Sequence, residues 1–433
     1  MTTRAAVLVV SSHEAMMDRR VVSEANAAAA SGRAVTLLET LPDRPEGLRP
    51  EIEYRAAARS GSGRAAGVLR GIVRRLPRGL RSVVRSVRYR AGFGPIESLA
   101  TTFAAIAPSH DHAIIHCHDA PTLPAALDLR RKRYPAARVI LDAHELFSEQ
   151  FPEAAFRNYW RRVEERHLGE VDGLVAVNPS IERELAGRFE IPHTTVIYNS
   201  FEPSHGRIRR RRRDELAARV GDTDPGFIVV FQGYLTQDRN LLELVDAFGE
   251  LGPEYRLYVF GEGPMERAMR RRSGSANLGN VFLGGWVPGA ELIDWVSAAD
   301  LGVIPYRGDY SKNHLLCTPN KLFEFIEAGI PVCASDLPEL SRIVLGSGIG
   351  HVGPMTDAHA IAATIRGARR LIEDGQISDG ARANAREQYG WERQAAELVR
   401  FYDAVEAGPV ARREGLSSRS PRSGNGTLRT GPA

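Results

Sequence analysis

The chain has 433 residues, of which 43% are hydrophobic and 25% charged, and its formal net charge is +4. This composition is ordinary for a globular protein, and the length predicts two or three domains that each bury their own core. No apolar run approaches the roughly 18–20 residues of a membrane-spanning helix, which excludes that class of protein.

The N-terminal half is expected to form an α/β domain. Short apolar runs have the composition of buried parallel strands, and helices are expected at residues 20–31 and 123–134. The expected strands lie at residues 5–11, 34–38, 113–116, 138–141, 173–177 and 195–197. Their alternation with helices predicts a doubly wound, Rossmann-like domain over residues 1–199.

A basic segment interrupts this first domain. Eleven Arg and no acidic residue lie between Tyr54 and Ile96. Within residues 64–92, apolar side chains recur on one helical face with Arg opposite, which predicts a cationic amphipathic segment suited to an anionic membrane. The alternative is an ordinary surface helix of an Arg-rich protein. Only one aromatic residue, Tyr89, lies within residues 64–92 and no recognition motif appears, so nucleic acid is not an expected partner.

The C-terminal half repeats the architecture without repeating the sequence. Residues 200–225 are polar and Arg-rich and are expected to form a linker, followed by a second α/β domain at 226–385. A helix at 386–406 is expected to pack back on the first domain, and residues 407–433 are predicted to be a disordered tail. The expected strands of the second domain lie at residues 227–232, 256–260, 281–283, 301–305 and 331–335. The predicted fold class is therefore α/β, with two Rossmann-like doubly wound domains facing a central ligand site.

Cysteine usage and the start of the chain indicate a compartment. Cys117, Cys317 and Cys333 share no close spacing, so neither a disulfide framework nor a paired-cysteine metal site is expected. The chain opens on an apolar strand rather than on a signal peptide. We expect a cytoplasmic protein, peripheral on the inner face of the plasma membrane if residues 64–92 bind lipid.

Glycines and one arginine mark the strand ends of the second half. A strand is expected to end at Gly233, where backbone can approach a ligand closely, and Arg239 follows at the start of the next helix. The fork of donors on an arginine suits a diphosphate, and the alternative is a solvated residue at a helix start. Gly261 and Gly263 form a second strand-to-helix turn, a feature that is more often structural.

A helix start carries the next signal. Pro319 and Asn320 are expected to begin a helix whose free N–H groups favour a bound diphosphate. Lys321 adds charge in the first turn, and Glu324, one turn further on, is placed to accept hydrogen bonds from ribose hydroxyls. These residue types in this order predict a site for a nucleoside diphosphate.

Two polar clusters follow adjacent strands in the first half. His116, His118 and Asp119 follow one strand, and His144 and Glu145 follow the next, so both clusters point to one site. The alternative is that these histidines ligate zinc. On the view that His116 and His118 point to opposite faces of their strand, His116 is expected to be packed inside and no metal site is predicted.

Specific motifs in both halves resemble one enzyme family. Gly233 with Arg239, the Gly-x-Gly-x-Pro turn and "PNKLFEFIEAGIPVCASDLPEL" are similar to the donor domain of the GT-B glycosyltransferases, in particular family 4 of retaining enzymes. The resemblance implies that Arg239 and Lys321 neutralise the donor diphosphate and Glu324 holds the ribose. The implied donor-binding set is Gly233, Arg239, Gly261, Gly263, Val287, Tyr306, Asn320, Lys321, Leu322 and Glu324.

The same resemblance extends to the acceptor side. "HCHDAPTLPAAL", "LDAHELFSE" and Asp18-Arg19-Arg20 are similar to elements of family 4. It implies that His118 is the catalytic residue beside the transferring sugar. The implied acceptor-binding residues are His13, Asp18, Asp119, His144 and Glu145. One departure concerns the sugar end, because Leu316 stands where the family often has a first glutamate.

The expected function is transfer of a sugar, with retention, from a UDP- or GDP-sugar to a glycan, lipid-linked or small-molecule acceptor in cell-envelope or exopolysaccharide synthesis. No cofactor or metal is expected, because charged side chains would stabilise the leaving diphosphate and the Asp222-Thr-Asp224 string lies in the linker. Two alternatives stay open: a GT-B-fold epimerase of nucleotide sugars, and a non-catalytic GT-B partner protein.

Overall fold

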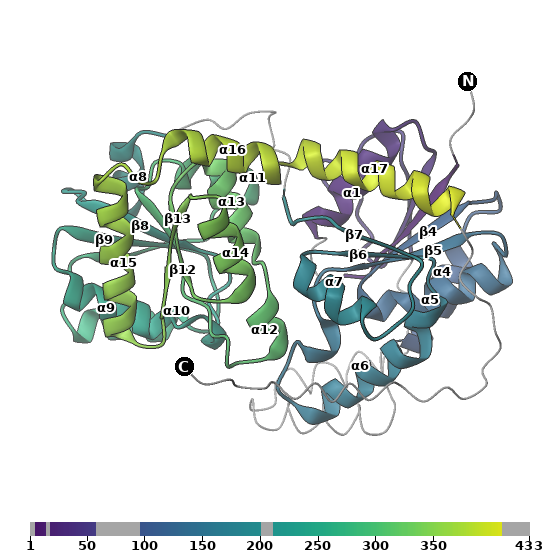
Figure 1. Ribbon diagram of the computed structural model, residues 1–433, viewed down its shortest axis with the longest axis horizontal. Coiled ribbons are helices and arrows are strands. Elements are labelled where there is room, and N and C mark those ends of the chain that lie inside the picture. Colours follow the sequence, from purple (N-terminus) through teal and green to yellow (C-terminus); the bar gives the residue numbers. More distant parts are fainter. Residues whose placement is uncertain (1–4, 14–17, 58–95, 201–210, 409–433) are drawn as a thin grey trace, which may run out of the picture.

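The computed structural model describes residues 5–13, 18–57, 96–200 and 211–408. These residues form two α/β lobes that lie side by side (Figure 1). One lobe is built on a parallel sheet of seven strands and the other on a parallel sheet of six. Two Rossmann-like domains, as predicted from the alternation of strands and helices, are therefore confirmed.

The N-terminal sheet has the strand order β3-β2-β1-β4-β5-β6-β7. Its strands are β1 (Val7–Val10), β2 (Val35–Glu39), β3 (Glu53–Ala56), β4 (Ile114–His118), β5 (Arg138–Ala143), β6 (Gly173–Ala176) and β7 (His193–Val196). The helices are α1 (Arg19–Ala30), α4 (Ile96–Ile106), α5 (Asp119–Lys132), α6 (Ala154–His167) and α7 (Pro179–Ala186), with short 3-10 turns η1 (Phe147–Glu149) and η2 (Leu168–Glu170).

The C-terminal sheet has the strand order β10-β9-β8-β11-β12-β13. Its strands are β8 (Phe227–Gln232), β9 (Tyr255–Phe260), β10 (Val281–Gly285), β11 (Leu301–Ile304), β12 (Val332–Ser335) and β13 (Gly350–Gly353). The helices are α8 (Arg213–Val220), α9 (Leu241–Leu251), α10 (Glu266–Ser275), α11 (Gly289–Val296), α12 (Lys312–Leu316), α13 (Asn320–Ala328), α14 (Pro338–Gly346), α15 (Ala358–Glu373) and α16 (Asp379–Tyr389), with the 3-10 turn η3 (Gln237–Arg239).

Central strands were predicted well because they are buried on both faces. Every residue of β1, β2 and β4 is buried, which favours the mainly apolar runs seen in the sequence. The edge strands β3 and β13 were not predicted. The four residues of β3 (Glu-Tyr-Arg-Ala) are only partly buried, and β13 begins and ends with glycine, so neither has the apolar signature of an inner strand.

The predicted linker contains a helix that belongs to the second domain. Helix α8 occupies residues 213–220 of the segment 200–225. Leu216 and Ala217 of α8 are buried in the hydrophobic core beneath the C-terminal sheet. The C-terminal domain therefore begins before residue 226 in three dimensions.

The last helix, α17 (Trp391–Ala407), returns to the first domain and packs on α1. Its apolar face, which includes Leu398 and Phe401, joins the core beneath the N-terminal sheet. Arg33, whose side chain is fully buried, pairs with Asp403 and Glu406 of α17 at 2.5 Å each. Figure 1 shows α16 and α17 crossing from one lobe to the other.

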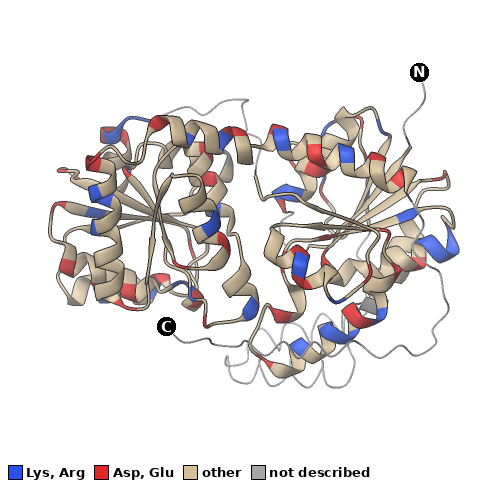
Figure 2. Ribbon diagram, viewed as in Figure 1, with Lys and Arg blue, Asp and Glu red and all other residues tan. Residues whose placement is uncertain are grey.

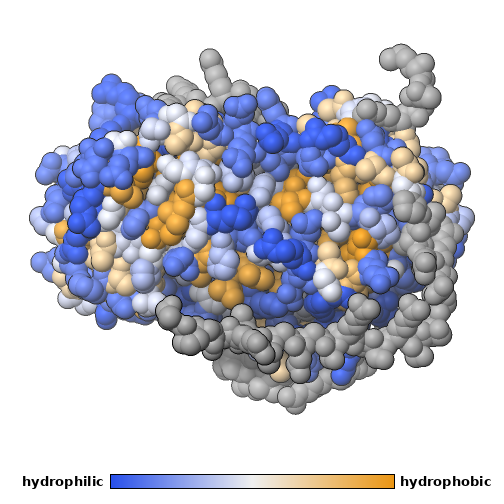
Figure 3. Space-filling model, in the orientation of Figure 1, coloured by the Kyte–Doolittle hydropathy of each residue, from blue (hydrophilic) through white to orange (hydrophobic). Residues whose placement is uncertain are grey.

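The surface shows no single dominant feature among the described residues. Acidic and basic side chains are mixed over both lobes (Figure 2), and hydrophobic residues on the face in Figure 3 form separate patches among hydrophilic ones. None of the helices in the described ranges is both long and apolar enough to cross a membrane. The predicted amphipathic segment at residues 64–92 and the predicted tail beyond residue 408 lie outside those ranges.

Candidate active site

Two cations of the C-terminal domain converge on the end of strand β8. Arg239 ends the turn η3, and Lys321 lies in the first turn of α13. A Cβ atom added at Gly233 would lie 3.2 Å from Arg239 Nη1 and 3.4 Å from Lys321 Nζ. Gly233 has a φ of 121°, which side-chain-bearing residues rarely adopt. The structure thus brings Gly233, one of the predicted donor-binding residues, beside the two cations that were assigned to the diphosphate.

The amine of Lys321 is buried among aromatic rings. It is 4% exposed, and its Nζ lies 4.5 Å from the ring centre of Phe231 and 4.7 Å from that of Tyr306. Burial, followed by the charge of Arg239, lowers the pKa of Lys321 well below its usual value. Within the described part of the chain Lys321 donates to Tyr306 Oη at 3.2 Å and forms no ion pair. A bound anion would supply the countercharge that this lysine lacks.

Gly261 and Gly263 support the cation site through backbone packing. A Cβ atom at Gly261 would lie 2.0 Å from the carbonyl oxygen of Gly233, and one at Gly263 would lie 2.5 Å from that of Leu235. The Leu235 N–H donates to the Glu262 carbonyl at 2.8 Å. The two predicted donor-site glycines therefore let the loop after β9 press against the loop after β8.

Glu324 is held at both carboxylate oxygens. Gln232 Nε2 donates to Oε2 at 2.7 Å, and Arg19 Nη2 donates to Oε1 at 2.6 Å. Glu324 is 5% exposed, whereas the side chain of Arg19 is 44% exposed. Arg19 comes from α1 of the other domain, so the predicted ribose carboxylate lies at the domain boundary.

Four other predicted donor residues have different surroundings. Val287 and Leu322 are 5% and 0% exposed, and their side chains lie in the hydrophobic core. Tyr306 is also buried, and the Arg239 guanidinium lies 5.2 Å from its ring centre. Asn320 is exposed at the start of α13, where its Oδ1 accepts a hydrogen bond from Asn199 Nδ2 at 3.0 Å.

Leu316, at the position of the often-found glutamate, has a packing role. This residue of α12 packs against the hydrophobic core of the N-terminal domain. Its carbonyl oxygen accepts a hydrogen bond from Asn178 Nδ2 at 2.8 Å. The leucine thus contributes apolar contact between the two domains at the expected sugar end of the site.

On the N-terminal side, the predicted acceptor residues gather around His144. Its Nδ1 lies 3.3 Å from Asp18 Oδ2, and its backbone N–H donates to Asp119 Oδ1 at 3.0 Å. His118 Nδ1 lies 3.0 Å from His144 Nε2. The side chain of His118 is 2% exposed and that of His144 is 11% exposed. His118, which was expected beside the sugar, therefore lies behind His144. This placement supports a role for His118 in positioning His144.

The carboxylates determine the charge on His144. Burial alone would lower the pKa of His144, but Asp119 and Asp142 outweigh it and raise that pKa well above its usual value. For Asp18, burial alone would raise the pKa, yet the hydrogen bond and the charge of His144 hold this pKa well below the normal range. An imidazolium at His144 and a carboxylate at Asp18 are the states that this geometry favours.

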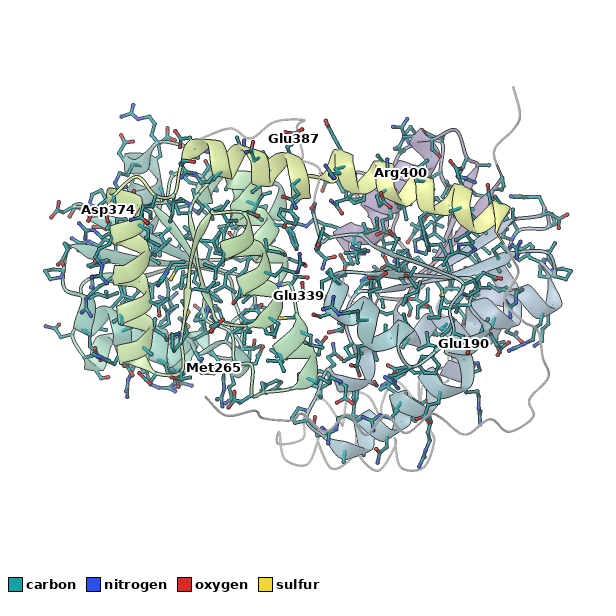
Figure 4. All side chains as sticks on the ribbon, in the orientation of Figure 1. Glu190, Met265, Glu339, Asp374, Glu387 and Arg400 are labelled. Atoms are coloured by element: carbon teal, nitrogen blue, oxygen red, sulfur yellow. The ribbon has the colours of Figure 1, made fainter. Side chains whose placement is uncertain are left out.

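Glu145 connects the acceptor side to the C-terminal domain. Asn313 Nδ2 donates to Glu145 Oε2 at 3.0 Å, and Asn313 Oδ1 accepts from the Leu146 N–H at 2.8 Å. Burial, followed by the nearby charge of Asp119, raises the pKa of Glu145 to about 8. Other contacts across the boundary include Ser180 with Glu339, the acidic residue labelled between the lobes in Figure 4.

His13 has both ring nitrogens engaged within the N-terminal domain. Its Nδ1 lies 2.9 Å from Glu39 Oε2, and its Nε2 accepts a hydrogen bond from the Asp18 N–H at 3.2 Å. This arrangement supports a role for His13 in holding Asp18, whose side chain caps α1.

The prediction that His116 and His118 point to opposite faces of their strand is wrong. Residues two apart in a strand share a face, and the two rings stack with their centres 4.7 Å apart. His116 is fully buried as expected, and its Nδ1 lies 2.7 Å from Tyr402 Oη of α17. The reason given for excluding a metal at these histidines therefore does not hold.

Three functional candidates were missed by reading the sequence. Arg19 belongs to the Asp18-Arg19-Arg20 motif, but its reach to Glu324 depends on how the domains meet. Gln232 and Asn313 have no local signal, since their roles come from contacts with residues 92 and 168 positions away in the chain.

Both domains match models of known protein families. Residues 17–205 match "Glycosyltransferase Family 4", and residues 226–374 match "Glycosyl transferases group 1". The phosphatidyl-myo-inositol mannosyltransferase of Mycolicibacterium smegmatis is 28% identical over 176 residues, which are 40% of this chain and 43% of that protein. A putative teichuronic acid biosynthesis glycosyltransferase of Bacillus subtilis is 22% identical over 193 residues, 45% of this chain and 44% of the relative. The matched regions span less than half the length of these curated relatives.

Solved structures match over nearly the whole chain. Sucrose-phosphate synthase from Thermosynechococcus elongatus has a TM-score of 0.64 at 18% identity, covering 92% of this chain and 98% of the other. The Anabaena protein HepE in complex with UDP has a TM-score of 0.63 at 13% identity, covering 92% and 99%. These likenesses show the fold alone. The chain therefore has a GT-B fold, whose first domain matches the Glycosyltransferase Family 4 model and whose second domain matches the glycosyl transferases group 1 model.

Proposed function

We propose that this chain is a retaining glycosyltransferase that takes its sugar from a UDP- or GDP-sugar. The observation that carries the proposal is the pair of cations beside Gly233. Arg239 and Lys321 lie next to the same glycine, and Lys321 is buried with no ion pair among the described residues. A diphosphate is the anion that best fits two adjacent cations, an accessible glycine backbone and the start of α13.

In this proposal the protein stabilises the leaving group. The bond between the anomeric carbon and the diphosphate oxygen breaks, and the developing charge is taken up by Arg239, Lys321 and the N–H groups of α13. Glu324 accepts hydrogen bonds from the ribose. Since two fixed cations supply the positive charge, we expect the reaction to need no metal at the diphosphate.

The acceptor is proposed to bind where the N-terminal domain presents Asp18, Asp119, His144 and Glu145. The acceptor hydroxyl attacks on the face that the diphosphate leaves, and its proton passes to the departing phosphate oxygen. His118 orients His144 from behind. The names of the relatives, a phosphatidyl-myo-inositol mannosyltransferase and a teichuronic acid enzyme, support a lipid-linked or glycan acceptor in envelope synthesis at the cytoplasmic membrane face.

A donor screen tests the proposal. The purified chain is incubated with UDP-, GDP- and ADP-sugars, and release of nucleoside diphosphate is measured with and without a crude acceptor extract. We expect turnover with a UDP- or GDP-sugar, unaffected by a metal chelator. Absence of both turnover and nucleotide binding would show that the chain is not a nucleotide-sugar enzyme.

A further inference from the structure

The carboxylate of Asp238 lies beside the predicted diphosphate site. Asp238 belongs to the turn η3 and directly precedes Arg239. Its Oδ2 lies 3.5 Å from Arg239 Nε, and this nitrogen forms no hydrogen bond within the described part of the chain. A carboxylate at this distance can pair with the guanidinium and would then compete with a phosphate ligand for it.

His314 of α12 holds the same carboxylate oxygen. Its Nε2 lies 2.7 Å from Asp238 Oδ2. Ser311 Oγ accepts the backbone N–H of His314 at 3.2 Å and lies 3.0 Å from the ring Nδ1, so the Ser311 hydroxyl proton is free to be donated to Nδ1. The ring then carries its own proton on Nε2, facing Asp238.

Asp238 is ionised in this arrangement. Burial alone would raise the pKa of Asp238, but its hydrogen bonds, with the largest effect from His314, and the charge of Arg239 hold that pKa well below its usual value. A negative charge therefore persists next to the cation that is expected to bind the diphosphate. Arg239 is free for a ligand only if this charge has another partner.

Helix α12 fixes the position of His314 through the residues that precede it. Lys312 Nζ pairs with Glu184 Oε1 at 2.6 Å, and Asn313 Nδ2 donates to Glu145 Oε2 at 3.0 Å. Both partners belong to the N-terminal domain. The position of His314 over the donor site therefore depends on how the two domains meet.

We propose that His314 is a positioning residue of the donor site, which engages Asp238 so that Arg239 remains available to the diphosphate. Both ring nitrogens of His314 have partners within the protein, so the imidazole acts through Asp238 and Arg239 rather than by touching the ligand. Without the imidazole, Asp238 would pair with Arg239 and weaken its interaction with the ligand. The proposal rests on the proposed function, because it requires a nucleoside diphosphate at Arg239.

Nucleotide affinity in a double-mutant cycle tests this role. Affinities of the full chain for UDP and GDP are measured by titration calorimetry, after circular dichroism has shown that each variant is folded. His314→Ala should bind the preferred nucleotide at least about threefold more weakly than the wild type. In the Asp238→Asn background no carboxylate competes for Arg239, so adding His314→Ala should change the affinity by less than about twofold. His314→Gln keeps an N–H that can donate to Asp238 and should bind nearly as the wild type does.

The matched control is His359→Ala, at a histidine whose 82% exposed side chain pairs with Glu250 of the same domain at 3.1 Å. It should bind UDP or GDP as the wild type does. If His314 had only a structural role, its removal would lower the affinity equally with and without Asp238→Asn. That result, or wild-type affinity in His314→Ala, would overturn the proposal. A wild type that binds neither nucleotide would instead refute the proposed function, and this proposal with it.

Discussion

Arg19 Nη2 lies 2.6 Å from Glu324 Oε1, joining the first turn of α1 to helix α13 across 305 positions of sequence. Through this contact the N-terminal domain holds one oxygen of the predicted ribose carboxylate. Gln232 holds the second oxygen of Glu324 at 2.7 Å. Ribose hydroxyls that bind Glu324 must therefore share its oxygens with Arg19 or displace it.

The first prediction concerns this competition. Arg19→Ala is expected to bind a nucleoside diphosphate more tightly than the wild type, because the ligand no longer competes with the guanidinium. A partly exposed ion pair contributes about 0.2–1 kcal/mol, so the gain should be at most about fivefold. Titration calorimetry measures it, with Arg49→Ala, whose exposed side chain pairs locally with Glu51, as control. Weaker binding by Arg19→Ala would instead show that Arg19 contacts the donor.

The second prediction separates binding from stability at Lys321. Lys321→Met should lower nucleoside diphosphate affinity by roughly ten- to hundredfold, the contribution of a hydrogen bond to a charged group. The free energy of unfolding should stay equal or rise, because a buried unpaired ammonium is replaced by an apolar side chain. Calorimetry and urea denaturation measure the two quantities. A variant that is less stable and binds as the wild type does would argue for a structural lysine.

The third prediction is a pH dependence of stability due to Glu145. In the folded protein the pKa of Glu145 is raised to about 8, against a usual value of 4.5. The native state therefore holds a proton that the unfolded chain loses, and this stability is present below pH 4.5 and is lost as pH rises through about 8. Glu145→Gln keeps the oxygen that accepts from Asn313 but does not titrate. Its unfolding free energy should fall less than that of the wild type between about pH 5 and about pH 9. Parallel pH profiles would contradict the assignment.

The fourth prediction tests whether α17 is part of the N-terminal core. A Cβ atom at Gly173 of β6 would lie 2.9 Å from Phe401 Cζ. Gly173→Ala should therefore cost about 1–3 kcal/mol, typical of overpacking a core. Adding Phe401→Leu should restore part of the loss, which a double-mutant cycle measures. If the double variant loses the sum of the free energies that the two single variants lose, Gly173 and Phe401 do not interact.

Local sequence was sufficient to predict the cation site. Gly233, Arg239 and Lys321 each lie at a strand end or helix start, and parallel sheets bring such positions to one edge. Gly233 was predicted because its backbone can approach a ligand closely, and Arg239 because its donors suit a diphosphate. The structure places both beside Lys321.

Contacts between the domains could not be predicted in the same way. Nothing near Arg19, Asn313 or Leu316 in the sequence indicates that each contacts the opposite domain. Such contacts depend on the relative placement of two independently folded sheets, which periodicity does not encode. The error at His116 and His118 has another origin. Side chains two residues apart in a strand lie on the same face, whereas the prediction placed these two on opposite faces.

The most direct test of the central claim is nucleotide binding by a matched set of variants. Affinities for UDP, GDP and ADP are measured for the wild type, Arg239→Ala, Glu324→Ala and the control Arg272→Ala, whose exposed side chain pairs with Asp246 away from the site. The control should bind UDP or GDP with the same affinity as the wild type. Arg239→Ala and Glu324→Ala should bind that nucleotide at least about tenfold more weakly. Wild-type affinity in both Arg239→Ala and Glu324→Ala, or no nucleotide binding by the wild type, would contradict the proposed donor site.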